Sequence, residues 1–354
     1  MPMLDKYAQI KLWTAALLSV ATLLIGFVGG YFLATPSAQQ PTTVTLKETV
    51  TTTVMLGPTY RIGLILSIGG LGDKGFNDAA YAGVIEAKEK LRIEFDLAQP
   101  RAIAEFESLI RDFARTGKYD LIISVGFYQV DPLTLVAKDF PNQKFAIIDA
   151  VVDQPNVASL IYEEHEGAFL VGVVAGLMTK TGKVGFVGGL DIPLIKYRYV
   201  GWAEGVKWAN PNAIIYERYV GAFDDPVKGK EVAIELISQG VDVLFHVAGR
   251  SGLGVLDAAK EKNVYAEGSD QDQSWYAPEN VVASLLKGVQ LSTFEIIKSI
   301  VDNNFRGGIH VYGLKNGGSD VAYGKMVPQE VKSKVEEAKR LILEGKIKVT
   351  DIRQ

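Results

Sequence analysis

The chain has 354 residues, of which 48% are hydrophobic and 22% are charged, and it contains no cysteine. This length predicts about two domains, and the hydrophobic fraction excludes a disordered chain. The 37 Lys and Arg residues are balanced by 41 Asp and Glu residues, which disfavours binding to nucleic acid. Without cysteine there is no disulfide, thiolate metal site, cysteine nucleophile or thioether lipid anchor, and three scattered histidines disfavour a metal centre. We therefore expect neither a metal nor another cofactor.

An apolar segment without charged residues runs from Leu12 to Leu33. As a helix it is about 33 Å long, enough to cross a bilayer, whereas signal-peptide cores have about 7–15 residues. Lys6 and Lys11 precede it, which predicts a cytoplasmic segment over residues 1–11 and an extracytoplasmic location for the rest. We expect residues 12–33 to be a single anchor in the cell membrane, or an uncleaved signal. A cleaved signal peptide is the alternative, because small residues follow at 34–38.

The next segment, residues 34–59, is predicted to be a Thr-rich stalk. Half of the residues from Pro41 to Val54 are threonine, and few of the others could contribute to a core. The folded part therefore begins near Tyr60.

From there to the end, apolar strands alternate with helical patterns. The predicted strands are 61–69, 93–99, 120–126, 144–150, 157–162, 183–190, 213–221, 241–249, 264–270, 281–288 and 310–312. The predicted helices are 77–91, 103–117, 134–140, 166–178, 199–211, 225–240, 252–262, 292–304 and 328–345. Such alternation indicates parallel sheets covered by helices on both faces. These strands are too many for one sheet of this kind, so we expect two doubly wound lobes with a ligand cleft between them.

Polar and aromatic residues collect directly after the predicted strands, where such sheets bind ligands. They are Asp73, Lys74, Phe76, Asn77, Asp78, Asp149, Phe223, Asp224, Asp225, Arg250, Ser251, Asp270, Asp272, Gln273 and Lys287. Two aromatic rings can sandwich a planar base, and carboxylates and amides can pair with its edge or with sugar hydroxyls. A phosphate would instead require several cations or a phosphate-binding loop, and GGLGDKG (69–75) matches no such loop. This set favours a neutral nucleoside.

Each of these positions also has a purely structural interpretation. Asn77 and Asp225 can cap the helices that follow them, and the glycines of the first loop can merely permit a turn. The two phenylalanines can be ordinary core residues, and Lys287 can be a solvated surface charge. His246, inside an apolar strand, is better explained as a core histidine than as a ligand.

The segment GGLGDKGFNDAAYAG (69–83) resembles the GxGDxSFND signature of the basic membrane protein family, nucleoside-binding lipoproteins of the purine nucleoside receptor type that serve ABC transporters. KFAIIDA, VGFVGGL, GWAEGVKWANP, YVGAFDDP and EGSDQDQ also resemble family blocks and occur in the family's order. The resemblance covers about residues 60–345.

The resemblance implies an α/β fold of the type I periplasmic-binding-protein class, with two lobes joined by three hinge crossovers. We expect lobe 1 to comprise residues 60–162 and 267–315, and lobe 2 to comprise residues 163–266 and 316–354. It also implies a purine nucleoside ligand such as guanosine, adenosine or inosine. The ligand-binding residues carried over from the motifs are Phe76 and Phe223 around the base, Asn77 and Asp149 at the base edge, Asp270 and Lys287 at the ribose, and Asp73 and Gly249 in the wall.

The sequence departs from the family pattern at two places. Gly75 replaces the serine of the signature, which removes a hydroxyl near the expected pocket. The chain also lacks the lipid-modified cysteine of bacterial members, and the apolar span with its stalk would take the place of that anchor.

We therefore expect an extracytoplasmic solute-binding protein that delivers a nucleoside to an ABC permease and its ATPase, without catalysis. Three alternatives stay open: a nucleoside sensor coupled to a membrane signalling partner, a receptor for another sugar-bearing or aromatic solute, and a nucleoside hydrolase that uses paired carboxylates. Against the hydrolase, no histidine joins the carboxylates and no nucleophile–base spacing is present.

Overall fold

The computed structural model describes residues 59–353. The predicted cytoplasmic segment (1–11) and anchor (12–33) lie outside this range, as does the predicted stalk (34–59) apart from its last residue. Within the described range, no helix combines the length and the hydrophobicity that crossing a bilayer requires.

Six parallel strands form the first sheet, in the order β11-β5-β4-β3-β1-β2. Their bounds are β1 (Tyr60–Ile65), β2 (Ile93–Ala98), β3 (Leu121–Val125), β4 (Phe145–Ile148), β5 (Val157–Tyr162) and β11 (Gly308–Tyr312). Strands β3 and β4 are buried along their whole length, because helices cover both faces of the sheet.

The second sheet has the order β12-β10-β9-β8-β6-β7, and only its edge strand β12 is antiparallel. Its strands are β6 (Lys183–Gly188), β7 (Ile214–Tyr219), β8 (Val243–Val247), β9 (Tyr265–Asp270), β10 (Val281–Lys287) and β12 (Ser319–Tyr323). Each sheet with its covering helices is called a lobe below, the first lobe containing β1 and the second β6.

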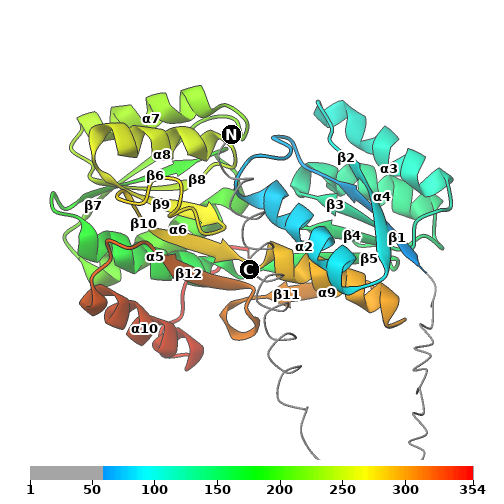
Figure 1. Ribbon diagram of the computed structural model, residues 1–354. Coiled ribbons are helices and arrows are strands. Elements are labelled where there is room, and N and C mark those ends of the chain that lie inside the picture. The colour runs from blue at the N-terminus through cyan, green and yellow to red at the C-terminus, as the bar shows by residue number, and fades with distance from the viewer. Residues whose placement is uncertain (1–58, 354) are drawn as a thin grey trace, which may run out of the picture. The chain divides into compact units, whose positions relative to one another are not determined.

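The helices of both lobes can be followed in Figure 1. Those of the first lobe are α2 (Phe76–Lys90), α3 (Phe106–Arg115), α4 (Val130–Asp139) and α9 (Val289–Val301). Those of the second lobe are α5 (Glu164–Met178), α6 (Pro193–Ala209), α7 (Pro226–Ser238), α8 (Ser251–Lys262) and α10 (Gln329–Leu343). Helix α9 packs on α2 and α3 lies beside α4, whereas α5 packs on α6 and α7 on α8. Three short 3-10 turns complete the described chain: η1 (Ile103–Glu105), η2 (Phe127–Gln129) and η3 (Leu314–Asn316).

The chain passes between the two sheets three times: after β5, after β10 and after β11. The predicted lobe boundary at residue 267 is wrong, because β9 and β10 belong to the second sheet, where β9 pairs with β8 and β10 pairs with β12. The physical reason is that α8 connects β8 to β9 as an ordinary parallel crossover, which keeps β9 beside β8. The second passage therefore occurs after Lys287.

Helix α6 and strand β12 are two of the elements that differ from the prediction. Helix α6 begins at Pro193, earlier than the predicted residue 199, because proline is well placed in a first helical turn. Strand β12 was not predicted, since it is a short edge strand that directly follows two glycines.

Helices α5 and α6 pack with their backbones in close contact. A Cβ atom at Gly201 would lie 2.2 Å from the carbonyl oxygen of His165, and one at Gly205 would lie 2.0 Å from that of Phe169. Only glycine permits this approach. It allows Glu164, at the start of α5, and Arg198, within α6, to face each other across the helix pair.

Candidate functional site

A cavity lies between the carboxyl ends of the two sheets and is lined by residues of both lobes. The first lobe contributes residues from its loops after β1, β3 and β4 and from the start of α2. The second lobe contributes residues from α6, from its loops after β7 and β8, and from the ends of β8 and β9. Seven of the eight predicted site residues line it: Asp73, Phe76, Asn77, Asp149, Phe223, Gly249 and Asp270. The eighth, Lys287, does not.

The loop before α2 is held by the carboxylate of Asp73. Its oxygens accept hydrogen bonds from the backbone N–H groups of Asn77 (2.8 Å), Gly75 (3.0 Å) and Asp78 (3.2 Å), and so cap α2. Burial raises the pKa of Asp73 to about 6, although these backbone donors favour the charged form. The helix cap suggested for Asn77 is thus supplied by Asp73.

Asn77 is itself buried, and its amide is fixed on both sides. The Oδ1 atom accepts from the backbone N–H of Ser67 (2.8 Å), and Nδ2 donates to Asp73 Oδ2 (3.0 Å). An amide oxygen has a second lone pair and the amide nitrogen a second hydrogen, so this side chain retains one acceptor and one donor site at the cavity wall.

Asp149 directly follows β4 and Asp270 is the last residue of β9, and both have the same unusual backbone. Their φ angles are 67° and 70°, in the left-handed region that few side chains other than Asn and Asp tolerate. Both lie at the cavity wall, one from each lobe. Strained backbone of this kind is typical of functional sites, where surrounding contacts maintain it.

The aromatic residues of the cavity come from both lobes. A Cβ atom at Gly126 would lie 3.4 Å from the ring of Phe76, and one at Gly189 would lie 2.3 Å from the ring of Phe223, so each ring lies against a glycine at a strand end. Phe127 makes an edge-on contact with Phe223, with the ring centroids 6.4 Å apart. Aromatic rings from both lobes therefore line the cavity.

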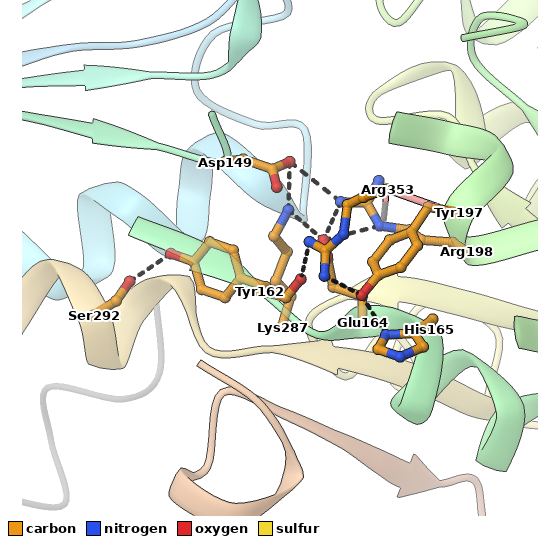
Figure 2. A network of polar contacts seen from close by, with 9 residues as sticks. All are labelled: Asp149, Tyr162, Glu164, His165, Tyr197, Arg198, Lys287, Ser292 and Arg353. Atoms are coloured by element: carbon orange, nitrogen blue, oxygen red, sulfur yellow. Dashed lines mark hydrogen bonds and ion pairs between the residues drawn. The ribbon is translucent and has the colours of Figure 1, made fainter. Parts of the chain in front are cut away.

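Asp149 belongs to a buried group of four charged side chains, which Figure 2 shows. The other three are Glu164, Arg198 and Lys287. Lys287 Nζ lies 2.5 Å from Asp149 Oδ2 and 2.7 Å from Glu164 Oε1. Arg198 Nη2 lies 3.2 Å from Asp149 Oδ2, and the same guanidinium pairs with Glu164. Two carboxylates and two cations thus neutralise one another, as buried charges must.

The two carboxylates of this group differ in their surroundings. Burial would raise the pKa of Glu164, but Arg198 and Lys287 outweigh it and lower that pKa to about 2. Burial also raises the pKa of Asp149, and there the nearby Lys287 opposes the rise without cancelling it. Asp149 Oδ2 is occupied by both cations, which leaves Oδ1 for a ligand in the cavity.

Three of the structural alternatives can now be judged. Lys287 is not a solvated charge, because its side chain is fully buried, with Nζ 4.8 Å from the ring centroid of Phe76. Asp225 does cap α7, since its carboxylate accepts from the N–H of Lys228 (3.0 Å). His246 is a core histidine whose Nε2 lies 2.8 Å from Gln273 Oε1. In the described part of the chain, no three His, Asp or Glu side chains are grouped in a way that could hold a metal ion.

The sequence from residue 61 to residue 353 matches the family described as ABC transporter substrate-binding protein PnrA-like. The chain belongs to this family. Among its relatives, basic membrane protein A of Borreliella afzelii is 33% identical over 299 residues, which cover 81% of this chain and 90% of that protein. An uncharacterized lipoprotein of Pyrococcus horikoshii is 34% identical over 277 residues, which cover 74% of this chain and 68% of that protein. The resemblance to the basic membrane proteins is thereby confirmed.

A solved structure shares the fold of this PnrA-like chain. It is an ABC transporter solute-binding protein from Aeropyrum pernix K1, with 32% identity and a TM-score of 0.78, covering 83% of this chain and 94% of that one. The predicted α/β fold with two sheets, like that of periplasmic binding proteins, is therefore correct.

Several cavity residues of this PnrA-like chain were not among the predicted site residues. Phe127 and Tyr128 follow β3 after one glycine, so the rule that ligands bind at strand ends could have found them. Arg198 lines the cavity from within a helix, and its partner Glu164, at the start of another helix, lies outside the cavity lining. No spacing in the sequence brings these two residues together. They meet only because α5 and α6 pack so closely.

Proposed function

We propose that this protein captures a purine nucleoside in the cavity between its lobes and delivers it to an ABC permease and its ATPase. One observation carries the proposal: Phe76 of the first lobe and Phe223 of the second line the same cavity as several carboxylates and a carboxamide. Stacked aromatic faces suit any planar base, while acceptor-rich groups suit its N–H edge and the hydroxyls of a ribose.

The proposed contacts follow the positions of these groups. Phe76 and Phe223 enclose the base, and Asn77 with Asp149 Oδ1 pairs with its edge. The carboxylate of Asp270, which has no hydrogen-bond partner among the described residues, takes the ribose hydroxyls, and Asp73 and Gly249 complete the wall.

The direct ribose contact predicted for Lys287 is withdrawn. Its ammonium would have to leave two carboxylates in the protein interior, which is strongly unfavourable. We assign Lys287 instead to holding Asp149 Oδ2, so that Oδ1 is presented to the ligand.

The charge of the cavity favours a neutral ligand over a phosphorylated one. Arg198 and Asp149 belong to the neutral group of four charges. At the cavity wall this leaves the carboxylates of Asp73 and Asp270 and the single cation of Arg250. A phosphate placed there would meet more carboxylates than unpaired cations, and the repulsion is large where water is excluded.

We place the two lobes outside the cytoplasm, tethered to the membrane by residues 12–33. The relative from Pyrococcus horikoshii is named a lipoprotein. Because this chain contains no cysteine, a thioether lipid is excluded and the apolar segment is the available anchor.

The deciding experiment is mass spectrometry of small molecules released when purified residues 56–354 are denatured, followed by calorimetric titration with guanosine, inosine and adenosine. We expect an intact nucleoside and micromolar or tighter binding of at least one of the three. Release of free base during incubation would indicate a hydrolase, and a different released solute without nucleoside binding would overturn the proposal.

A further inference from the structure

The two lobes touch at the rim of the cavity, in front of Asp270. The loop after β9 carries Gln273, whose side chain is almost fully buried, with 1% of its surface exposed. Its Nε2 donates a hydrogen bond to the backbone carbonyl oxygen of Lys74 (3.0 Å), in the loop before α2. Gln273 belongs to the second lobe and Lys74 to the first, so this bond spans the cleft.

We infer that Gln273 is a latch that holds the lobes closed over the captured solute. The inference goes beyond the proposed nucleoside and depends only on solute capture between the lobes. It rests on the hydrogen bonds within each lobe that orient the Gln273 amide and the Lys74 carbonyl toward each other.

On the second lobe, the amide of Gln273 has a single possible orientation. The backbone N–H of Ser269 donates to one amide atom (3.0 Å), and because an N–H can only donate, that atom must be the oxygen. His246 Nε2, 2.8 Å from the same oxygen, must then carry a proton. The amide nitrogen is thereby turned toward the first lobe.

Two features of the second lobe's core, His246 and Gly268, agree with this orientation of the amide. Burial lowers the pKa of His246 to about 4, so its ring is neutral at physiological pH and has one N–H to donate. A Cβ atom at Gly268 would lie 2.6 Å from Gln273 Oε1, so the strand also needs a glycine there to admit the amide.

On the first lobe, the carbonyl of Lys74 is held by the cap of α2. Lys74 has a left-handed backbone, with φ 55°, and its N–H donates to Asp78 Oδ2 (3.0 Å). The next N–H, that of Gly75, donates to Asp73 Oδ1 (3.0 Å). Carboxylates on both sides of the peptide thus keep its oxygen directed at Gln273.

At Gly75 the two loops lie close enough for ordinary van der Waals contact. A Cβ atom at this position would lie 3.4 Å from Asp270 Oδ2 and 3.6 Å from the carbonyl oxygen of Ser269. The latch therefore closes directly over Asp270, a residue of the cavity wall. Opening the lobes separates these two loops and breaks the hydrogen bond between Gln273 and Lys74.

The test compares Gln273→Met with a matched control. The methionine has similar size but cannot donate to Lys74. Asn280→Leu is the control, because Asn280 is also a buried amide of the same loop, and its Nδ2 donates only to Val264 (2.9 Å) and Ala259 (3.3 Å) of its own lobe. A loss of stability common to both variants is thereby separated from a loss of closure.

Inter-lobe distance is measured by electron paramagnetic resonance. Spin labels are attached to Asp112→Cys on α3 and Glu231→Cys on α7, both exposed and in different lobes, in a chain with no other cysteine. Distances are recorded without ligand and with saturating guanosine. We expect guanosine to shorten the distance in the otherwise unmodified protein and in Asn280→Leu. In Gln273→Met we expect the ratio of closed to open molecules to fall about 3- to 10-fold, as for loss of one ordinary hydrogen bond.

The possible results separate the latch from the nucleoside. If guanosine closes Gln273→Met as fully as the control, the latch is overturned and the nucleoside stands. If guanosine changes no distance but Gln273→Met is more open than the control, the nucleoside is overturned and the latch stands. If guanosine has no effect and the variants have equal distances, both are overturned.

Discussion

Arg198 of the second lobe pairs with Asp149 of the first, with Nη2 3.2 Å from Oδ2, at a point where both residues line the cavity. The pair is part of a neutral group of four charges (Figure 2), so removing a single member leaves one charge uncompensated in the interior.

Replacing Arg198 with methionine tests the group of four charges. Asp149 and Glu164 would then share one cation, Lys287, and the free energy of unfolding should fall by about 3–5 kcal/mol. Urea denaturation measures this change. Arg218→Met is the control, because the Arg218–Glu235 pair is exposed and its loss should cost at most about 1 kcal/mol. Equal losses in both variants would contradict the interpretation.

Replacing Phe223 with alanine tests the proposed sandwich of the base. Loss of one stacking face should weaken nucleoside binding by about 1–3 kcal/mol. Calorimetric titration with guanosine gives the dissociation constant. The control is Trp208→Ala, an aromatic residue that is 38% exposed and does not line the cavity. An unchanged dissociation constant for Phe223→Ala would remove this ring from the binding site.

Asp73 gives the protein a pH dependence of stability that can be isolated with Asp73→Asn. The pKa of Asp73 rises from 3.8 to about 6 on folding, so the unfolded chain releases this proton first. The associated stabilisation is complete below pH 3.8 and is lost as the pH rises to about 6, by at most about 3 kcal/mol. The free energy of unfolding, measured from pH 4 to pH 7, should therefore fall relative to that of Asp73→Asn. A constant difference between the two proteins would contradict the raised pKa.

Glu267 provides a second pH effect, in the core of the second lobe. It is fully buried, its Oε2 accepts from Trp202 Nε1 (2.8 Å), and burial raises its pKa well above the usual value. Its neutral form is favoured in the folded state, so its contribution to stability is lost as the pH rises above about 4.5. Glu267→Gln should lack this decline, and the thermal midpoints of the two proteins should diverge between pH 5 and pH 9. Parallel midpoints would show that Glu267 is charged in the folded protein.

Much of the fold could be predicted, because its strands are continuous apolar runs and its helices carry recognisable boundaries. The run at 281–288 and the proline at residue 193 illustrate the limits. The apolar run correctly indicated a strand, but nothing local in it says which sheet it joins. The proline shows where α6 begins only once a helix is known to continue beyond it.

The candidate site divides in the same way. Residues that follow strands, such as Asp149 and Phe223, were placed at the cavity by the rule for parallel sheets. Lys287 also lies at a strand end, but it does not line the cavity, because its ammonium group is paired with the buried carboxylate of Glu164. Glu164 and Arg198 depend on the contact of two helices, which is a property of packing rather than of position in the sequence.

The three passages of chain between the sheets have a consequence for how the molecule can be divided. Neither lobe is a continuous stretch of sequence, so any fragment that contains all the strands of one sheet also contains at least one strand of the other. A protease that cuts once near Gly288 would leave the two lobes joined by the connections after β5 and after β11. Gel filtration would therefore still recover one particle. The first sheet is thus complete only after β11 has been synthesised, and the second only after β12.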